Sequence, residues 1–182
     1  VSLALDSQNN EEKRLVNFIN KEITKLQTKE AKQLQELKVA RDNLQYEQIG
    51  NILAANIHQV KPYQKEITVY NFYDDSDITI ALNTKIPPKD NIDYYFNKYK
   101  KAKRSITAIT AEIEKTRTNI AYYQTLLQQS TNINTNDLKE ILEEVGISKA
   151  PKRPQKPQLL KYLDDNGNII WVGKNNIQNN YL

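Results

Sequence analysis

Cysteine and methionine are both absent from this chain of 182 residues, and glycine is scarce, with 4 residues. Without cysteine the chain has no disulfide bond and no thiolate ligand for a metal ion. Scarce glycine and a hydrophobic content of 38% suit long helices with thin cores better than a compact α/β enzyme. No apolar run approaches the ~20 residues that a membrane-spanning helix needs.

The residue combinations that carry catalysis are also missing. The only histidine, His58, lies in a helical pattern, where such a side chain usually packs rather than reacts. No glycine-rich phosphate loop occurs, and the acidic residues do not have the spacing of a calcium-binding loop. We therefore expect a non-enzymatic protein that needs no metal and no cofactor.

The net charge is +4, which permits an anionic partner without requiring one. The chain contains 11 tyrosines, a kind of aromatic side chain that is useful at wet surfaces. It starts at Val1 with neither an initiator methionine nor a signal-peptide pattern. We interpret this start as that of a fragment.

The longest regular pattern in the sequence runs from Tyr99 to Ser130. Its apolar or small residues recur at alternating steps of three and four: Tyr99, Ala102, Ile106, Ile109, Ile113, Thr116, Ile120, Tyr123 and Leu127. This is the a/d spacing of a coiled coil, which leaves one narrow apolar seam on an otherwise polar helix. A seam this narrow predicts one partner helix rather than burial in a globular core.

A second helical pattern, from Glu11 to about Gln59, supplies that partner. Its apolar residues at helical spacing are Leu15, Ile19, Ile23, Leu26, Leu37 and Leu44. Glu30 and Gln33 take seam positions, which predicts weaker packing there. Residues 1–10 are expected to form an irregular lead-in.

Between the two helical patterns the sequence predicts a β-hairpin. β-Branched and aromatic residues alternate with others over Glu66–Tyr73 and again over Asp77–Leu82. The polar turn Asp74-Asp75-Ser76 separates the two strands. Because the connection is short, the two helices should return antiparallel, with this hairpin, about residues 66–82, at their tip.

Two further boundaries frame the helices. Pro87-Pro88 precedes the second long helix, and Asp90 or Asn91 is the expected cap. After the polar break at 130–134 a short amphipathic helix is expected, capped by Thr135 or Asn136 and ended by Gly146. The apolar residues of that helix are Leu138, Ile141, Leu142 and Val145.

The C-terminal part of the chain predicts a linker and the start of another domain. Residues 148–158 are basic and proline-rich, which is typical of an extended linker. In residues 159–182 two short apolar strands flank Asp165-Asn166-Gly167, and Asn-Gly predicts a two-residue type I′ hairpin turn. The fold class is thus mainly α: an antiparallel two-helix coiled coil with a hairpin over residues 1–147, then the linker, then the truncated start of an α+β domain.

One run of cations stands out, and we call it the basic cluster: Lys98, Lys100, Lys101, Lys103 and Arg104. It should lie near the hairpin end of the helix, with Tyr63, Tyr70, Tyr73 and Tyr94 nearby. Cations neutralise phosphates and aromatic faces stack on bases, so the cluster is a candidate RNA-binding surface. An ordinary solvated coiled-coil face is the alternative, and the residues alone favour it.

A second candidate follows the C-terminal hairpin, and we call it the amide segment: Lys174, Asn175, Asn176 and Asn179. These residues leave a strand and enter a predicted helix, whose first N–H groups can hold a phosphate. Capping of the helix by asparagine is the alternative, and chemistry alone favours it.

Three separated segments resemble the NFACT family. Residues 166–182, read as Asn166-Gly167 through Gly173-Lys174-Asn175-Asn176 to Tyr181-Leu182, resemble the opening of its RNA-binding NFACT-R domain. Gly50–Ile57 and Tyr94–Arg104 resemble two further segments of the family, in the same order. Asn180 departs from the acidic residue that is usual at its position.

The resemblance implies that this coiled coil is a docking arm of a ribosome quality-control factor. Such a factor binds the large ribosomal subunit and tRNA, rescues stalled ribosomes and adds alanine tails to stalled chains. The family's tRNA-selection residues lie in an N-terminal domain, so no tailing is expected from this chain alone. With the resemblance counted, the basic cluster and the amide segment are our predicted RNA-binding residues, and the protein is expected to be cytoplasmic.

Two alternatives remain open. Family members are also described as surface adhesins without a signal peptide, and the exposed edges of the 66–82 hairpin could pair with an extended segment of fibronectin or fibrinogen. The third interpretation is a homodimer, formed through Leu160–Val172 or through the long helices.

Overall fold

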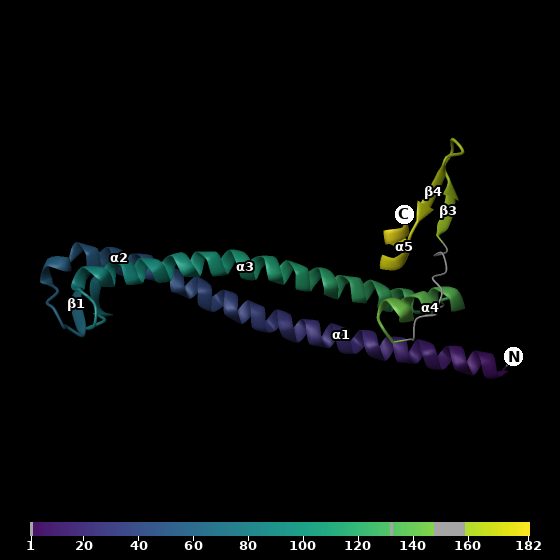
Figure 1. Cartoon of the computed structure of the whole chain (residues 1–182), viewed down its shortest axis with the longest axis horizontal. Coiled ribbons are helices and arrows are strands. Elements are labelled where there is room, and N and C mark those ends of the chain that lie inside the picture. The colour runs from purple at the N-terminus through teal and green to yellow at the C-terminus, as the bar shows by residue number, and fades with distance from the viewer. Residues whose placement is uncertain (1, 132, 148–158) are drawn as a thin grey trace. The chain divides into compact units, whose positions relative to one another are not determined.

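The computed structural model describes residues 2–131, 133–147 and 159–182 (Figure 1). The linker predicted for 148–158 therefore lies outside the described residues. The elements are α1 (Ser2–Asp42), a 3-10 turn (Asn43–Gln45), α2 (Tyr46–Ala55), a 3-10 turn (Ile57–Gln59), β1 (Glu66–Asn71), β2 (Ser76–Ala81), α3 (Pro88–Gln129), α4 (Thr135–Glu144), β3 (Leu160–Leu163), β4 (Ile169–Val172) and α5 (Asn176–Tyr181). The mainly helical fold, with α1 packed against α3 and two antiparallel hairpins, is confirmed.

The chain divides into two compact units. One contains residues up to Gln27 together with Thr118–Leu182, and the other contains Thr28–Arg117. We call them the terminal unit and the hairpin unit. Segments of α1 and α3 contribute to both, so each unit has its own portion of the helix pair.

In the hairpin unit, β1 and β2 pack on α2 and on the start of α3. The strands pair antiparallel from Glu66↔Ala81 to Asn71↔Ser76, so the predicted hairpin is confirmed. Residues of β1 alternate between exposed and buried, as a strand with one packed face requires. The buried core consists of Ile52, Leu53, Ile67, Val69, Ile80, Leu82 and Tyr95.

A close approach of α2 and α3 explains Gly50, which lies inside a helix. A Cβ atom built on Gly50 would lie 2.9 Å from Cε1 of Phe96, closer than ordinary van der Waals contact. The missing side chain therefore makes room for the Phe96 ring. This packing offsets the roughly 1 kcal/mol that glycine costs relative to alanine in a helix.

Two predicted helix starts are corrected. Helix α1 begins at Ser2, so the expected irregular lead-in is wrong, and Gln8 Nε2 donates to the carbonyl oxygen of Ile133 at 3.4 Å. Helix α3 begins at Pro88, because proline suits the first helical position, where no N–H partner is needed. Asn91 is therefore no cap. It lies within α3, is buried, and its Oδ1 accepts a 2.7 Å hydrogen bond from the Asn83 N–H.

The core of the terminal unit joins three helices. Its buried residues are Leu15 and Ile19 of α1, Leu126 of α3, and Leu138, Ile141 and Leu142 of α4. Leu126 lies outside the predicted seam but is buried, whereas the seam residue Leu127 is half-buried. The reason is that α4 also packs on α3, so the apolar face of α3 is wider than a strict a/d stripe. Asn134, rather than Thr135 or Asn136, caps α4, and its Oδ1 accepts from the Asp137 N–H at 2.8 Å.

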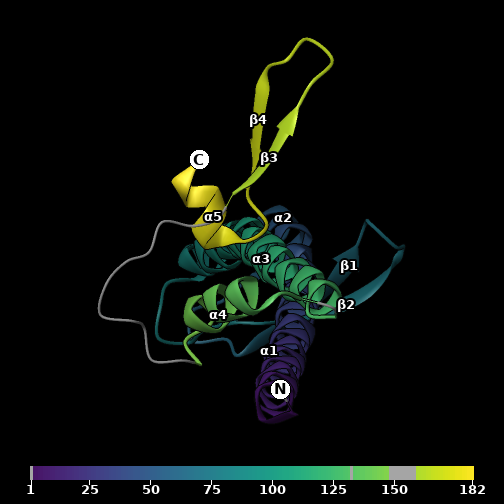
Figure 2. The same cartoon turned by 90° about the vertical axis from the view of Figure 1, so that its right-hand side faces the viewer.

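The second hairpin has a longer loop than predicted. Leu163 pairs with Ile169, and Gly167 is the only residue of the connecting loop with positive φ, at 81°. A type I′ turn needs two such residues, so that prediction is wrong. The Asp164 carboxylate holds the loop instead, accepting from the N–H groups of Asn166 and Asn168. In both views the β3–β4 hairpin extends away from α3 and α4, and α5 follows at its base (Figures 1 and 2).

Candidate nucleic-acid interface

The basic cluster begins within a group of packed aromatic rings in the hairpin unit. The Tyr46 and Tyr95 rings stack with centroids 5.8 Å apart, and Tyr94 meets Tyr95 edge-on at 5.3 Å. Lys98 Nζ lies over two of these rings, 4.8 Å from the Tyr46 centroid and 4.6 Å from the Tyr94 centroid. The ring faces hold this ammonium group in place by cation–π attraction.

Two members of this group, Lys98 and Tyr95, have a raised pKa. A side-chain hydrogen bond to Tyr94 raises the pKa of Lys98, so this lysine stays charged. Burial raises the pKa of Tyr95, whose hydroxyl donates to the carbonyl oxygen of Ala81. Tyr95 thus anchors α3 to the end of β2 and positions the turn of helix that carries Lys98.

The other four members of the basic cluster are exposed. At about 3.6 residues per turn, Lys98 and Lys101 lie on one side of the α3 seam and Lys103 on the other. Lys100 and Arg104 lie on the face opposite the seam. Lys103 Nζ also reaches the Tyr99 ring, 5.5 Å from its centroid. The cations therefore surround the helix rather than forming one flat patch.

A groove of about 490 Å³ lies between α1 and α3 in the hairpin unit. Its floor includes Ala40 and Ala102, both buried, whose small side chains leave space between the helices. Lys98 and Lys101 line one side of the groove, and Glu36 lines the other. Two members of the basic cluster thus border a partly apolar groove.

The loop of the first hairpin carries the opposite charge. Asp74 and Asp75 of the loop and Asp77 at the start of β2 are exposed, and Tyr70 donates its hydroxyl to Asp75 Oδ1 at 2.6 Å. Phosphates are repelled by carboxylates, so this loop does not extend a phosphate-binding surface. The β1–β2 end of the hairpin unit is therefore acidic, whereas the basic cluster lies on α3.

The amide segment in the terminal unit is already engaged with its own chain. Asn175 caps α5 by accepting from the Gln178 N–H at 2.9 Å, and Gln178 Oε1 accepts from the Lys174 N–H at 2.8 Å. Asn175 is 3% exposed and Gln178 0%. Asn176 and Asn179 keep exposed side chains. The structure therefore shows the capping role that sequence chemistry favoured, while RNA binding by this segment stays a prediction.

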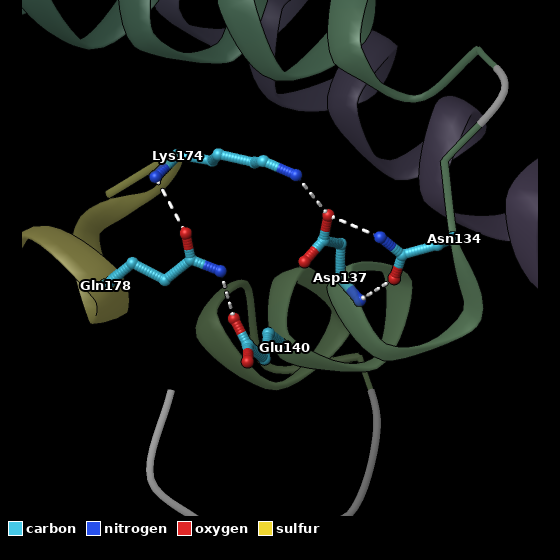
Figure 3. A network of polar contacts seen from close by, with 5 residues as sticks. All are labelled: Asn134, Asp137, Glu140, Lys174 and Gln178. Carbon is cyan, nitrogen blue, oxygen red and sulfur yellow. Dashed lines mark hydrogen bonds and ion pairs between the residues drawn. The ribbon is translucent and has the colours of Figure 1, made fainter. Parts of the chain in front are cut away.

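Sequence reasoning missed the carboxylates of α4 that meet this segment. Lys174 Nζ lies 2.9 Å from Asp137 Oδ2, and Gln178 Nε2 donates to Glu140 Oε2 at 2.7 Å (Figure 3). The Asn176 N–H donates to Glu144 Oε1 at 3.3 Å. The available signal was the acidic spacing 137, 140 and 144, which places three carboxylates along one side of a helix.

Two kinds of feature are absent from the described residues. They contain no helix long and apolar enough to cross a membrane. In the same part of the chain no group of three or more His, Asp or Glu side chains is arranged to hold a metal ion.

Fold and site together define a paired-helix protein with a hairpin and a cluster of cations and aromatic rings, and no catalytic role is indicated for this region. Residues 2–159 match the family described as NFACT N-terminal and middle domains. The chain belongs to the NFACT family.

The similar proteins carry one name. The chain is 34% identical over 180 residues to the Rqc2 homolog RqcH of Bacillus subtilis (strain 168). The matched region covers 92% of this chain and 32% of that relative. It is 33% identical over 177 residues to the Rqc2 homolog RqcH of Streptococcus suis (strain 05ZYH33), with the same coverage. The chain thus spans about a third of the length of these relatives.

Proposed function

We propose that this chain is a non-enzymatic docking arm of a cytoplasmic ribosome quality-control factor, and that its basic cluster contacts RNA of the large ribosomal subunit. In the longer protein, this contact would help to hold the factor and its tRNA on a subunit that carries a stalled chain. The amide segment would supply a second RNA contact. Alanine tailing itself would depend on other parts of such a protein.

One observation carries the proposal: four exposed cations surround one stretch of α3 directly beside a group of packed tyrosines. A cation on a rigid helix loses less entropy when it meets a phosphate than one on a mobile loop. The exposed Tyr94 offers a ring face or edge next to these cations, where an unpaired base can stack. Similarity to proteins named RqcH supports the choice of partner.

The test is co-sedimentation of the chain with purified large ribosomal subunits across a salt series. Binding should weaken steeply as salt rises, because neutralised phosphates release counterions. Reversal of three exposed cations, by Lys100→Glu, Lys103→Glu and Arg104→Glu, should abolish most of the binding. The salt slope should also fall by roughly one for each phosphate that is no longer neutralised.

A matched control keeps the overall change of charge the same. Lys13→Glu, Lys21→Glu and Lys32→Glu reverse three exposed cations of α1, and this variant should bind far better than the α3 variant. Unchanged sedimentation of the α3 variant would overturn the proposal, as would equal losses in both variants. The α3 variant could lose binding while the parent chain still binds large-subunit proteins that have been freed of RNA. That result would assign the contact to a ribosomal protein.

Immobilised fibronectin provides the parallel arm of this experiment. Saturable binding that resists high salt, with no ribosome binding beside it, would favour the adhesin interpretation. No contact of the described residues singles out that interpretation, so it stays a prediction.

A further inference from the structure

The acidic side of α4 meets residues 174–178 at three separate points within the terminal unit. Asp137 pairs with the Lys174 ammonium group, Glu140 accepts from the Gln178 amide, and Glu144 accepts from the Asn176 N–H. The side chains of Asp137 and Lys174 are 11% and 35% exposed, so this ion pair is partly shielded from water. Figure 3 shows Lys174 and Gln178 pointing toward α4 from the start of α5.

Each of these interactions uses a group that is also suited to a phosphate. An ammonium group, an amide N–H₂ and a backbone N–H are all donors, and a phosphate oxygen accepts from each of them. In this arrangement the three carboxylates of α4 take the place of such an acceptor. Lys174 therefore has its charge neutralised by its own chain.

Two of these carboxylates accept hydrogen bonds from other residues of the terminal unit, and all three lie on a helix that packs in its core. Asn134 Nδ2 donates to Asp137 Oδ2 at 2.8 Å, and the Tyr122 hydroxyl donates to Glu144 Oε1. The apolar face of α4 is fixed in the core by Leu138, Ile141 and Leu142. The carboxylates are thus presented by a rigid helix, whereas β3 and β4 beside α5 have exposed residues on both faces.

We propose that Asp137, Glu140 and Glu144 form an internal docking surface that holds residues 174–178 in a charge-dependent latch, and that a phosphate-bearing polymer opens this latch by competing for Lys174. The proposed competition between the polymer and α4 for Lys174 rests on the proposed function, whereas the internal contact with α4 does not. When the latch is closed, the amide segment is held against α4. When it is open, Lys174 and Gln178 can donate to the polymer.

The first experiment measures the latch alone. The chain contains no cysteine, so Asn20→Cys and Asn180→Cys, both exposed and both in the terminal unit, place two spin labels for electron–electron distance measurement. The parent should give one narrow distance distribution. Asp137→Asn with Glu140→Gln should broaden it, because the charged acceptors are gone while the side-chain shapes remain.

The matched control removes two carboxylates that have no described contact with α5, by Glu11→Gln with Glu143→Gln. Its distance distribution should stay narrow. The latch is overturned if the α4 variant stays as narrow as the parent, or if the control broadens equally.

The second experiment adds a single-stranded oligouridylate to the same labelled chains. It should broaden the parent distribution, and the Asp137→Asn/Glu140→Gln variant should bind it roughly tenfold more tightly than the control of equal net charge, the ratio expected for one additional charge-assisted hydrogen bond. Adding Lys174→Gln should erase that difference. Equal affinities, or bound RNA with an unchanged narrow distribution, would overturn the competition. The distance distribution of the Asp137→Asn/Glu140→Gln variant could broaden although neither the parent nor any variant binds the oligouridylate. That result would support the latch and count against the RNA contact of the proposed function.

Discussion

Thr116 of α3 donates its hydroxyl to Gln33 Oε1 of α1 at 2.9 Å, in the helix seam of the hairpin unit. Both side chains are buried, with 1% of Thr116 and 9% of Gln33 exposed. Next to them, Arg117 Nε lies 2.6 Å from Glu30 Oε1. The polar seam positions that predicted weaker packing therefore form a paired polar layer, which favours one register of α1 on α3.

Removing one partner of this layer should cost more than removing both. Thr116→Val keeps the side-chain shape but leaves the buried Gln33 amide without that donor, which should lower the unfolding free energy by about 1–3 kcal/mol. Gln33→Leu combined with Thr116→Val restores an apolar seam and should be near neutral or stabilising. Urea unfolding of the four chains of this double-mutant cycle measures the coupling. Costs that simply add would show that the two side chains act independently.

Because the core of the terminal unit is wider than the a/d seam, Leu126 and Leu127 of α3 should contribute unequally to the unfolding free energy. Leu126→Ala should lower the unfolding free energy by about 2–5 kcal/mol, because it opens a cavity in the three-helix core. Leu127→Ala should cost clearly less, since that side chain is half-buried. Thermal or urea unfolding of the two variants makes the comparison. The reverse order would support the strict heptad seam instead.

Tyr122 should make the terminal unit sensitive to alkaline pH. Burial, and then the hydrogen bond to Glu144, raises the pKa of Tyr122 above its ordinary value of 10.0. The folded state therefore keeps this proton where the unfolded state loses it. The resulting stabilisation is fully present below about pH 10 and is lost as the pH rises further.

Tyr122→Phe removes this proton and should flatten the fall of unfolding free energy between about pH 10 and pH 11.5. At neutral pH the same change should lower stability, because Glu144 loses a hydrogen-bond donor. Tyr63→Phe, at a side chain that is 84% exposed, serves as the control. The same alkaline slope in Tyr122→Phe and the parent would contradict the assignment.

Lys98 and Arg104 should behave differently although both belong to the basic cluster. Lys98→Gln removes a cation held over two tyrosine rings, which should lower the unfolding free energy by about 1 kcal/mol. Arg104→Gln changes an exposed side chain and should leave stability within about 0.5 kcal/mol. Calorimetric unfolding and ribosome co-sedimentation of both variants separate the roles. A larger loss of stability from Arg104→Gln would contradict them.

Patterns within single segments anticipated most of the fold. The a/d spacing of α3 predicted a partner helix, alternation predicted the β1–β2 hairpin, and two short apolar runs about Asn-Gly predicted the β3–β4 hairpin. Single caps and turns were less predictable. Asn91 has the side chain of a cap but is used inside the helix to hold Asn83, and Asn134 caps α4 in place of its neighbours. Several nearby residues have suitable chemistry in each case, and only packing selects among them.

The sequence by itself determined the periodicities, and through them the long paired helices, the hairpins and the position of the basic cluster on α3. Such patterns follow from backbone geometry, which repeats within a few residues. Only the tertiary structure decided that Lys98 lies over Tyr46 and that Lys174 meets Asp137, 37 positions away. Those contacts depend on where packing brings separate elements together, and no local spacing encodes that.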